Sequence, residues 1–210
     1  MTGAEGGEAS GYAAIILAAG AGQRFGGGKL LAPWRGAPLV AGAVRAALAT
    51  PANPVLVVTG TDADAIADAC LAAASGPDRD RLRLVHAADH AEGMGASLRA
   101  GVTALPPGLK GVFVFLGDMP AIPPDIIEPL MAALEAGAPA VAPEHEGQRG
   151  HPVLFSARLL PELALAKGDA GARDVLRALG PRLALAPCDS PGVLFDVDRP
   201  QDLDGRRLRP

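Results

Sequence analysis

The sequence predicts an α/β fold of three layers, in which helices cover both faces of a mostly parallel central sheet. Short aliphatic or β-branched runs alternate with longer Ala-rich segments along the 210 residues, which is the order of repeated βα units. Hydrophobic residues make up 49% of the chain but aromatic residues only 3%, so the core must consist of Ala, Val, Leu and Ile. Such a core is typical of parallel strands under Ala-rich helices. The length suits one domain of this kind and is too short for two.

Strands and helices are expected in alternation over the first two thirds of the chain. The strand candidates are residues 13–18, 54–59, 82–86, 111–116 and 139–142. The helix candidates are residues 39–49, 62–74, 95–104 and 125–135. Beyond residue 143 the pattern loosens, with a strand candidate at 153–155 and helix candidates at 157–166 and 170–179. Right-handed crossovers would bring the loop after the first strand, with residues 86–94 and 117–120, to one crevice at the carboxyl edge of the sheet.

The two ends of the chain are expected to lie outside this domain. Residues 1–11 are acidic and Gly-rich without the features of a signal peptide, which predicts a disordered tail, and residues 205–210 predict a frayed one. No apolar stretch approaches a membrane span, no Lys/Arg run suggests a membrane surface, and a net charge of −4 gives no basic field for nucleic acid. Cys70 and Cys188 lack zinc or disulfide spacing, so we expect reduced packing residues in a cytoplasmic protein.

The loop after the first strand candidate has the composition of a phosphate site. Residues 17–29 read LAAGAGQRFGGGK, with five glycines and the cations Arg24 and Lys29. Glycines let the backbone approach a ligand and point N–H groups at one anion, while the cations supply charge for a nucleoside triphosphate. A P-loop is excluded because Gln23 stands where its first Gly is required, and a dinucleotide fingerprint because Phe25 replaces its third Gly. Ordinary surface charges are the alternative for the two cations, although five neighbouring glycines disfavour it.

Carboxylates follow two other segments. Asp118 comes after the apolar run 112–116, where a central strand should end. A carboxylate at that point suits Mg²⁺, which is typically held by one or two carboxylates and substrate phosphates; it also suits the cap of a turn. Asp196 and Asp198 alternate along an extended segment, so both can point to one side and one can supply a second metal ligand. Alternatively, Asp198 starts the short helix that follows.

Six segments, in this order, resemble those of a known family. They are residues 17–29, 92–99 (EGMGASLR), 117–120 (GDMP), 150–153 (GHPV), 168–173 (GDAGAR) and 196–203 (DVDRPQDL). Together they resemble the molybdenum cofactor cytidylyltransferases, a branch of the nucleotidyltransferases that share a single Rossmann-like domain. The resemblance covers about residues 13–203 and departs at Arg199, where the family usually has Thr.

The resemblance implies one nucleotidyltransferase domain over residues 12–204. Residues 12–142 would bind the nucleotide, and residues 143–204 would bind the acceptor and complete the metal site. The nucleotide-binding candidates are Leu17, Ala18, Ala19, Gly20, Gly22, Arg24, Lys29, Gly93, Ser97 and Gly117. The metal, Mg²⁺ or Mn²⁺ in its place, would be held by Asp118 and by Asp198 or Asp196, of which Asp198 is favoured.

Arg24, Lys29 and Asp118 are the candidate catalytic residues. Arg24 suits the β- and γ-phosphates that leave, and Lys29 suits the α-phosphate, where charge builds up in the transition state. Ser97 and Arg99 suit either a contact with base or ribose or a plain helix start.

His151, Asp169 and Arg173 are the acceptor-binding candidates. A phosphate nucleophile is already ionised at neutral pH, so His151 is interpreted as a turn or pocket residue rather than a general base. Asp169 and Arg173 suit the acceptor pocket and plain surface about equally.

The implied reaction is transfer of CMP from CTP to the terminal phosphate of molybdopterin carrying molybdenum, giving the cytosine dinucleotide cofactor and pyrophosphate. A molybdenum hydroxylase or dehydrogenase would receive the product. The alternatives within the enzyme class are GTP on molybdopterin and CTP on a sugar or polyol phosphate, and Ala19, where the guanylyl branch usually has Gly, bears on the choice of base. A non-catalytic cofactor carrier has no use for Asp118 and Lys29, and a glycosyltransferase would show Asp-x-Asp where residues 118–120 read DMP.

Overall fold

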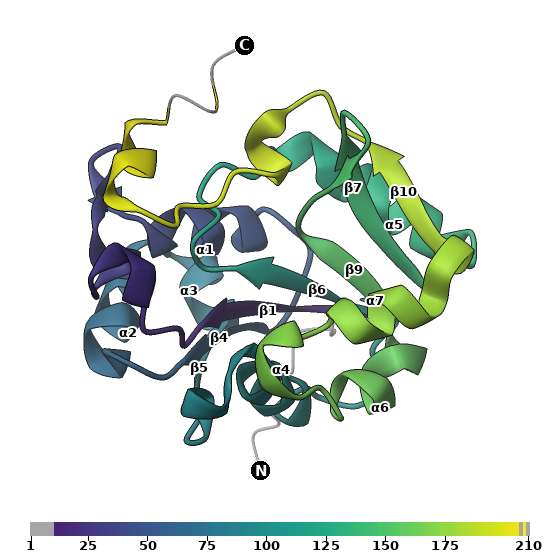
Figure 1. Ribbon diagram of the computed structural model, residues 1–210. Helices are drawn as coiled ribbons and strands as arrows, with labels where there is room; N and C mark the ends of the chain where they lie inside the picture. The colour runs from purple at the N-terminus through teal and green to yellow at the C-terminus, as the bar shows by residue number, and fades with distance from the viewer. Residues whose placement is uncertain (1–10, 206–207, 209–210) are drawn as a thin grey trace.

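A mostly parallel sheet runs through the middle of the molecule (Figure 1). The structure is a computed structural model and describes residues 11–205 and Leu208. Its strands are β1 (Tyr12–Ala18), β4 (Val55–Thr59), β5 (Leu82–His86), β6 (Gly111–Leu116), β7 (Ala140–His145), β8 (Gln148–Arg149), β9 (Val153–Ser156) and β10 (Leu183–Pro187). They lie in the order β10-β7-β9-β6-β1-β4-β5, with β8 paired to β7. Along this path only β9 runs antiparallel to its neighbours, so the prediction of a mostly parallel sheet is confirmed.

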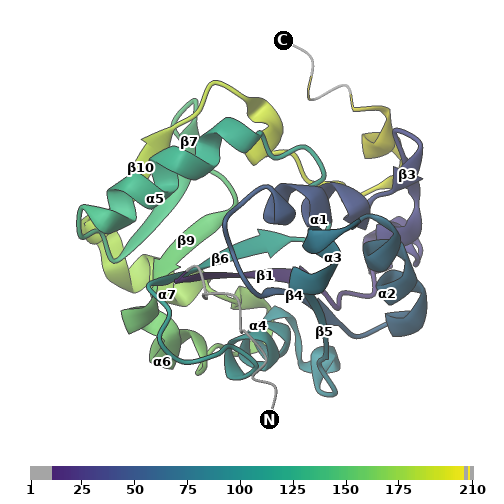
Figure 2. The same ribbon diagram turned by 180° about the vertical axis from the view of Figure 1, so that it is seen from behind.

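Helices cover both faces of the sheet. They are α1 (Val40–Leu48), α2 (Ala63–Ala72), α3 (Pro77–Arg81), α4 (Met94–Thr103), α5 (Ile127–Glu135), α6 (Leu160–Leu163) and α7 (Arg173–Leu179). Helices α4, α6 and α7 lie below the sheet in Figures 1 and 2, whereas α1 and α5 lie above it, and α2 packs in the same core as α1 and α5. A hydrophobic core lies on each face of the sheet, and consecutive residues of β1 point into opposite cores. Ile16 packs in the core that contains Val44 of α1, and Ile15 packs in the core that contains Leu98 of α4. The predicted three-layer α/β fold is confirmed.

Two predicted helices near the C-terminus are shorter than expected. Residues 157–166 divide into a 3-10 turn, Ala157–Leu159, and the four-residue α6, because Pro161 has no N–H to continue the α-helical ladder. Helix α7 begins at Arg173 rather than at residue 170, because Gly171 has a φ of +53° that interrupts a helix.

Some elements were not expected from the sequence. Strand β10 reads LALAP, whose Ala and Pro have low strand propensity, and it forms through parallel pairing with β7. Strand β7 continues past residue 142 because Glu144 pairs with Arg149 across a hairpin to β8. A small hairpin of β2 (Pro33–Trp34) and β3 (Ala37–Pro38) follows residues 17–29, which we call the glycine loop. Sequence patterns miss these elements because neighbouring strands, rather than local propensity, stabilise them.

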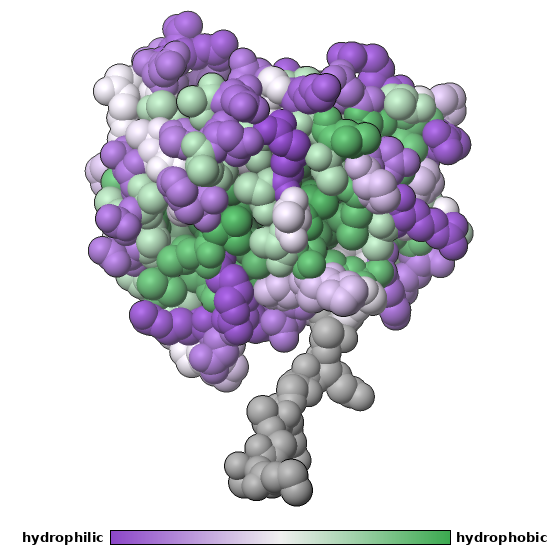
Figure 3. Space-filling view, turned by 90° about the horizontal axis from the view of Figure 1, so that it is seen from below, coloured by the Kyte–Doolittle hydropathy of each residue, from purple (hydrophilic) through white to green (hydrophobic). Residues whose placement is uncertain are grey.

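The predicted tails lie mostly outside the described residues. Of residues 1–11 the structure describes Gly11, and of residues 205–210 it describes Gly205 and Leu208. Within that described part of the chain, no helix has both the length and the hydrophobicity needed to cross a bilayer. The underside of the molecule, over α4 and α6, shows hydrophobic residues in its middle and hydrophilic ones around them (Figure 3).

Candidate active site

A pocket of about 570 Å³ lies at the carboxyl edge of the sheet. It forms where the strand order reverses, since β1 lies between β4 and β6, and open α/β sheets bind ligands at such a point. Its lining residues are Leu17, Ala19, Gly20, Ala21, Gly22, Gln23, Lys29, Leu30, Thr61, His90, Ala91, Gly93, Met94, Ser97, Leu116, Asp118 and Asp169. The structure therefore brings most of the predicted nucleotide-binding residues to one cavity.

The glycine loop folds so that Lys29 enters this pocket. The carbonyl of Gly22 accepts hydrogen bonds from the N–H groups of Phe25 and Gly27, at 2.9 and 3.2 Å. Gly22 has a φ of +60°, and a Cβ at this position would lie 2.8 Å from the Cβ of Lys29. Because both the backbone angle and the close approach favour glycine, Gly22 sets the path of the chain to Lys29.

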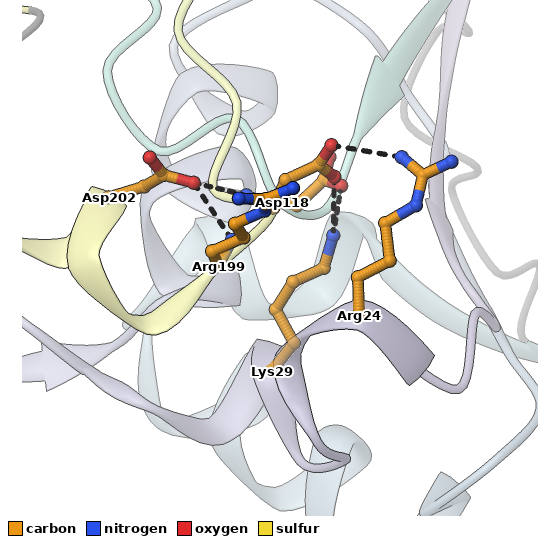
Figure 4. A network of polar contacts seen from close by, with 6 residues as sticks. Arg24, Lys29, Asp118, Arg199 and Asp202 are labelled. Carbon is orange, nitrogen blue, oxygen red and sulfur yellow. Dashed lines mark hydrogen bonds and ion pairs between the residues drawn. The ribbon is translucent and has the colours of Figure 1, made fainter.

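Lys29 and Asp118 line one end of the pocket, and Arg24 and Asp198 form ion pairs with this cluster (Figure 4). Lys29 Nζ donates to Asp118 Oδ2 at 2.6 Å and lies 3.8 Å from Asp198 Oδ1. Arg24 Nη1 donates to Asp198 Oδ2 at 3.3 Å. The Lys29 side chain is only 13% exposed, whereas that of Arg24 is 79% exposed. We call Arg24, Lys29, Asp118 and Asp198 the charged end; two carboxylates from distant segments share one ammonium there.

Main-chain contacts bring the two carboxylates together. The N–H of Val197 donates to the carbonyl of Asp118 at 3.1 Å, which ties the segment of Asp198 to the end of β6. Phe195 and Val197 are 2% and 0% exposed and pack in a cluster with Trp34. The alternation expected along this segment is therefore present: the apolar residues are buried, and the two aspartates between and after them are half-buried.

The turn after Asp198 is capped although Arg199 stands where the family pattern usually has Thr. One carboxylate oxygen of Asp202 accepts hydrogen bonds from the N–H groups of Asp198 and Arg199, at 3.0 and 2.8 Å (Figure 4). The turn after Asp198 is thus held from within the segment, without a Thr at residue 199.

The other end of the pocket has, among the described residues, Asp169 as its only carboxylate and no Lys or Arg. It is formed by the loops after β4 and β5 and by the start of α4, through Thr61, His90, Gly93 and Ser97, and we call these four residues the neutral end. Gly93 has a φ of +110°, and a Cβ there would collide with Asp169 Oδ1. Gly93 therefore lets the loop that carries Asp169 lie directly against the start of α4.

Arg99 holds the loops at the neutral end from outside the pocket lining. Its guanidinium donates to Asp89 at 2.6 Å, to Glu92 at 2.8 Å and to the carbonyl of Ala166 at 2.7 Å. These bonds lower the pKa of the Asp89 carboxyl and raise that of Arg99. The sequence left open a contact with base or ribose and a plain helix start for Arg99; the structure places Arg99 in α4, outside the pocket lining, where it links two loops.

The acceptor candidates occupy different positions. Asp169 lines the pocket, while Arg173 is exposed at the start of α7. His151 Nδ1 is buried and has no hydrogen-bond partner among the described residues. Burial lowers the pKa of His151 to about 4; Asp118 opposes this shift, and the nearby cations Arg149 and Arg173 add to it. His151 is therefore neutral at physiological pH.

Arg24 and Asp198 lie beside the pocket but are not part of its lining, and three further predicted residues do not line it either. Ala18 is 1% exposed in the core under α1, and Gly117 donates its N–H to the carbonyl of Leu17 at 2.9 Å, at the junction of β6 and Asp118. Asp196 also lies outside the lining, next to the segment of Asp198. Thr61 and His90 line the pocket but were not predicted from the sequence. Their position in the loops that follow two strand candidates, for His90 within residues 86–94, was the available signal.

A family model and several curated proteins match this chain. The model of the MobA-like NTP transferase domain matches residues 14–188. Nicotine blue oxidoreductase of Paenarthrobacter nicotinovorans is 33% identical, over 88% of this chain and 90% of that protein. The molybdenum cofactor cytidylyltransferase of Escherichia coli is 26% identical, over 90% of this chain and 91% of that protein. The 2-C-methyl-D-erythritol 4-phosphate cytidylyltransferase of Streptomyces avermitilis is 37% identical, over 62% of this chain and 52% of that protein.

Solved structures share the fold over nearly the whole chain. A crystal structure of a protein from Mycobacterium sp. strain JC1 has a TM-score of 0.77 at 27% identity, and covers 95% of this chain and 96% of that one. A Mycobacterium tuberculosis protein in complex with manganese has a TM-score of 0.73 at 23% identity, and covers 94% of this chain and 97% of that one. With the glycine loop and the aspartates at the carboxyl edge of the sheet, these matches show that the chain belongs to the family of MobA-like NTP transferase domains, within the Rossmann-like nucleotidyltransferase superfamily.

Proposed function

We propose that this nucleotidyltransferase transfers CMP from CTP to the terminal phosphate of molybdopterin carrying molybdenum, and releases pyrophosphate. The observation that carries the chemistry is the charged end, where Asp118 and Asp198 share the ammonium of Lys29 beside a glycine loop. The choice of CTP and molybdopterin is supported by the six ordered sequence segments and by the similarity to the Escherichia coli cytidylyltransferase.

The two carboxylates of the charged end fit one Mg²⁺ or Mn²⁺ ion. They already lie close enough to approach a single cation, at 2.6 and 3.8 Å. No group of three or more potential ligand side chains occurs among residues 11–205 and Leu208, which suits an ion that takes its other ligands from phosphates and water. When bound, the metal would neutralise triphosphate charge and polarise the α-phosphate. The manganese complex of a protein with the same fold supports the use of a divalent metal.

Lys29 and Arg24 would act on different phosphates. Lys29 is largely buried between the carboxylates, so its ammonium needs only a short movement to follow charge that develops on the α-phosphate. Arg24 is exposed at the outer edge of the charged end, where it would hold the β- and γ-phosphates. A phosphate oxygen of the acceptor attacks the α-phosphorus, and the bond from that phosphorus to the pyrophosphate oxygen breaks. The attacking oxygen carries no proton at neutral pH, so the reaction needs no general base.

We assign acceptor binding to residues 143–204. Asp169 lines the pocket, and Arg149 and Arg173 lie near enough to His151 to lower its pKa. The two cations suit an anionic acceptor, and the neutral His151 would add a hydrogen-bonding atom without adding charge. In the same proposal, residues 12–142 bind the nucleotide.

A second candidate is the transfer of CMP to a polyol phosphate. The similarity to a 2-C-methyl-D-erythritol 4-phosphate cytidylyltransferase favours it, although that match covers 62% of this chain against 90% for the molybdenum cofactor enzyme. Oxidoreductase activity, which the name of another relative suggests, is disfavoured because Phe25 stands where a dinucleotide fingerprint needs its third Gly.

Product analysis with matched substrates tests this proposal. The purified protein and Mg²⁺ are incubated with each of four nucleoside triphosphates, and with molybdopterin or 2-C-methyl-D-erythritol 4-phosphate as acceptor. We expect pyrophosphate and a cytosine dinucleotide from CTP and molybdopterin, with at least about a tenfold preference in kcat/KM for CTP over GTP. Faster turnover with GTP or with the polyol phosphate would contradict it, and the Asp118→Asn variant serves as the inactive control.

A further inference from the structure

The imidazole of His90 is held in one tautomer at the neutral end. Its Nδ1 lies 3.0 Å from the carbonyl of Ala87, which can only accept, so Nδ1 carries the proton and donates. In the neutral ring the lone pair is then on Nε2, which lies 3.4 Å from Thr61 Oγ1. The pocket wall thus presents a fixed acceptor, His90 Nε2, beside a hydroxyl that can rotate.

Packing fixes the position of this ring as well. Gly60 lies under it, and a Cβ on Gly60 would be 2.5 Å from His90 Cγ, so a side chain there would displace the imidazole. Arg99 bonds to Asp89 and Glu92, one on each side of His90 in the sequence. The ring is held by the Nδ1 hydrogen bond, a glycine beneath it and a braced loop, so on binding only the Thr61 hydroxyl has to turn from Nε2 toward the ligand, which suits selective recognition.

The pair formed by His90 and Thr61 matches one pyrimidine better than the other. Cytosine presents an amino donor at N4 next to an acceptor at N3, which complements an acceptor at His90 Nε2 and a donor at Thr61. Uracil presents a carbonyl at O4, which would face the lone pair of Nε2. Binding uracil in this way would require the other tautomer of His90 and would leave the carbonyl of Ala87 facing a lone pair.

We propose that His90, together with Thr61, recognises the amino group of the base and sets the preference for CTP over UTP. This role rests on the proposed function, because it concerns the base of the nucleotide that binds there. Adenine also carries an amino group beside a ring acceptor, and the same proposal assigns the exclusion of purines to the methyl group of Ala19 on the pocket wall rather than to His90.

Equilibrium binding of CTP and UTP, measured by calorimetry in the presence of Mg²⁺, tests the role of His90. The wild-type protein should bind CTP at least about tenfold more tightly than UTP. His90→Phe keeps a ring over Gly60 but removes the acceptor, so we expect weaker CTP binding and a ratio within about twofold of one. Thr61→Val should reduce the ratio in part, and His90→Gln, whose amide oxygen accepts, should restore part of it.

His86→Phe is the matched control. His86 is exposed and lies outside the pocket lining, although its ring centroid is 6.1 Å from that of His90. It should leave the CTP:UTP ratio unchanged, and thermal unfolding of all variants checks that the fold persists.

The two proposals fail in different ways. A wild-type protein that prefers CTP, combined with a His90→Phe variant that keeps the tenfold ratio, would overturn the role of His90 and leave the proposed function standing. A wild-type protein that binds GTP in preference to CTP would overturn both.

Discussion

At the charged end of the pocket, functional side chains neutralise one another: Lys29 lies between Asp118 and Asp198, and Arg24 pairs with Asp198. At the neutral end, uncharged atoms of Thr61 and His90 form the wall, and the ion pairs of Arg99 lie outside it. Phosphates are common to all nucleotides, whereas the base distinguishes them. On the proposed function, we infer that the charged end sets the rate of transfer and the neutral end sets the choice of nucleotide.

The largest effect is expected from Asp118→Asn. The variant keeps the shape of the side chain but removes the charge that faces Lys29 and the proposed metal, so kcat should fall about 10²–10³-fold. Steady-state pyrophosphate release measures the rate, and circular dichroism checks the fold. A variant that retains more than about a tenth of the wild-type rate would show that Asp118 is not the principal metal ligand.

Lys29→Met should lower kcat by about 10²-fold, because the ammonium no longer follows charge on the α-phosphate. The same variant leaves Asp118 and Asp198 without their shared cation, so Mn²⁺ should bind more tightly in the absence of nucleotide. Electron paramagnetic resonance of free Mn²⁺ measures this affinity. If removal of the ammonium weakened Mn²⁺ binding, the two aspartates would not form the metal site.

The sequence predicts the charged end better than the neutral end. Five glycines, two cations and an aspartate after an apolar run identify the charged end, because each residue type there is unusual in its position. The pairing of Asp198 with Lys29 across the chain depends on the packing of Phe195 and Val197 beside Trp34, which a sequence pattern does not show.

The neutral end is harder to predict. His90 and Thr61 are ordinary polar residues in loops, and their role depends on a carbonyl at Ala87 and on space above Gly60. Strands β1, β4, β5 and β6 coincide closely with hydrophobic runs in the sequence. Strand β10 has no such run and forms through its pairing with β7, which the sequence does not show. Local pattern thus predicts the scaffold and the charges, and tertiary contacts decide the rest.

His151 should produce a pH-dependent loss of stability next to the charged end. Its pKa of about 4 lies below the usual value near 6.5, so the unfolded chain binds a proton there before the folded one does as the pH falls. The free energy of unfolding should therefore fall between about pH 6.5 and pH 4, by about 1–2 kcal/mol at pH 5 from this residue. Urea unfolding of the wild type and of His151→Gln across this range isolates the effect. Parallel curves for the two proteins would contradict it.

Arg24→Ala should act mainly on KM. Its side chain is 79% exposed and solvent-screened, so we expect KM for the triphosphate to rise about three- to tenfold, equally for CTP and UTP, with little change in kcat. Arg99→Ala is the matched arginine at the neutral end, and loss of its bonds to Asp89 and Glu92 should lower the CTP:UTP ratio. An equal change in selectivity for both variants would break the division between the two ends.

The smallest effect is expected from Ala19→Gly. Ala19 is 4% exposed and lines the pocket, where its methyl group removes room that glycine would leave. The substitution should reduce the preference for CTP over GTP by about two- to fivefold without reversing it, since one methyl group contributes only modest discrimination. Competition kinetics with both nucleotides measures the change, and an unaltered preference would mean that Ala19 does not limit the size of the base.

The division of roles is tested most directly by competition between CTP and UTP in one reaction, carried out with the wild-type protein, Lys29→Met and His90→Phe. The account predicts that Lys29→Met lowers total turnover about 10²-fold while the ratio of cytosine to uracil products stays within about twofold of the wild-type value. His90→Phe should do the opposite, with the ratio collapsing toward one. A Lys29→Met variant that loses selectivity together with rate would contradict the account.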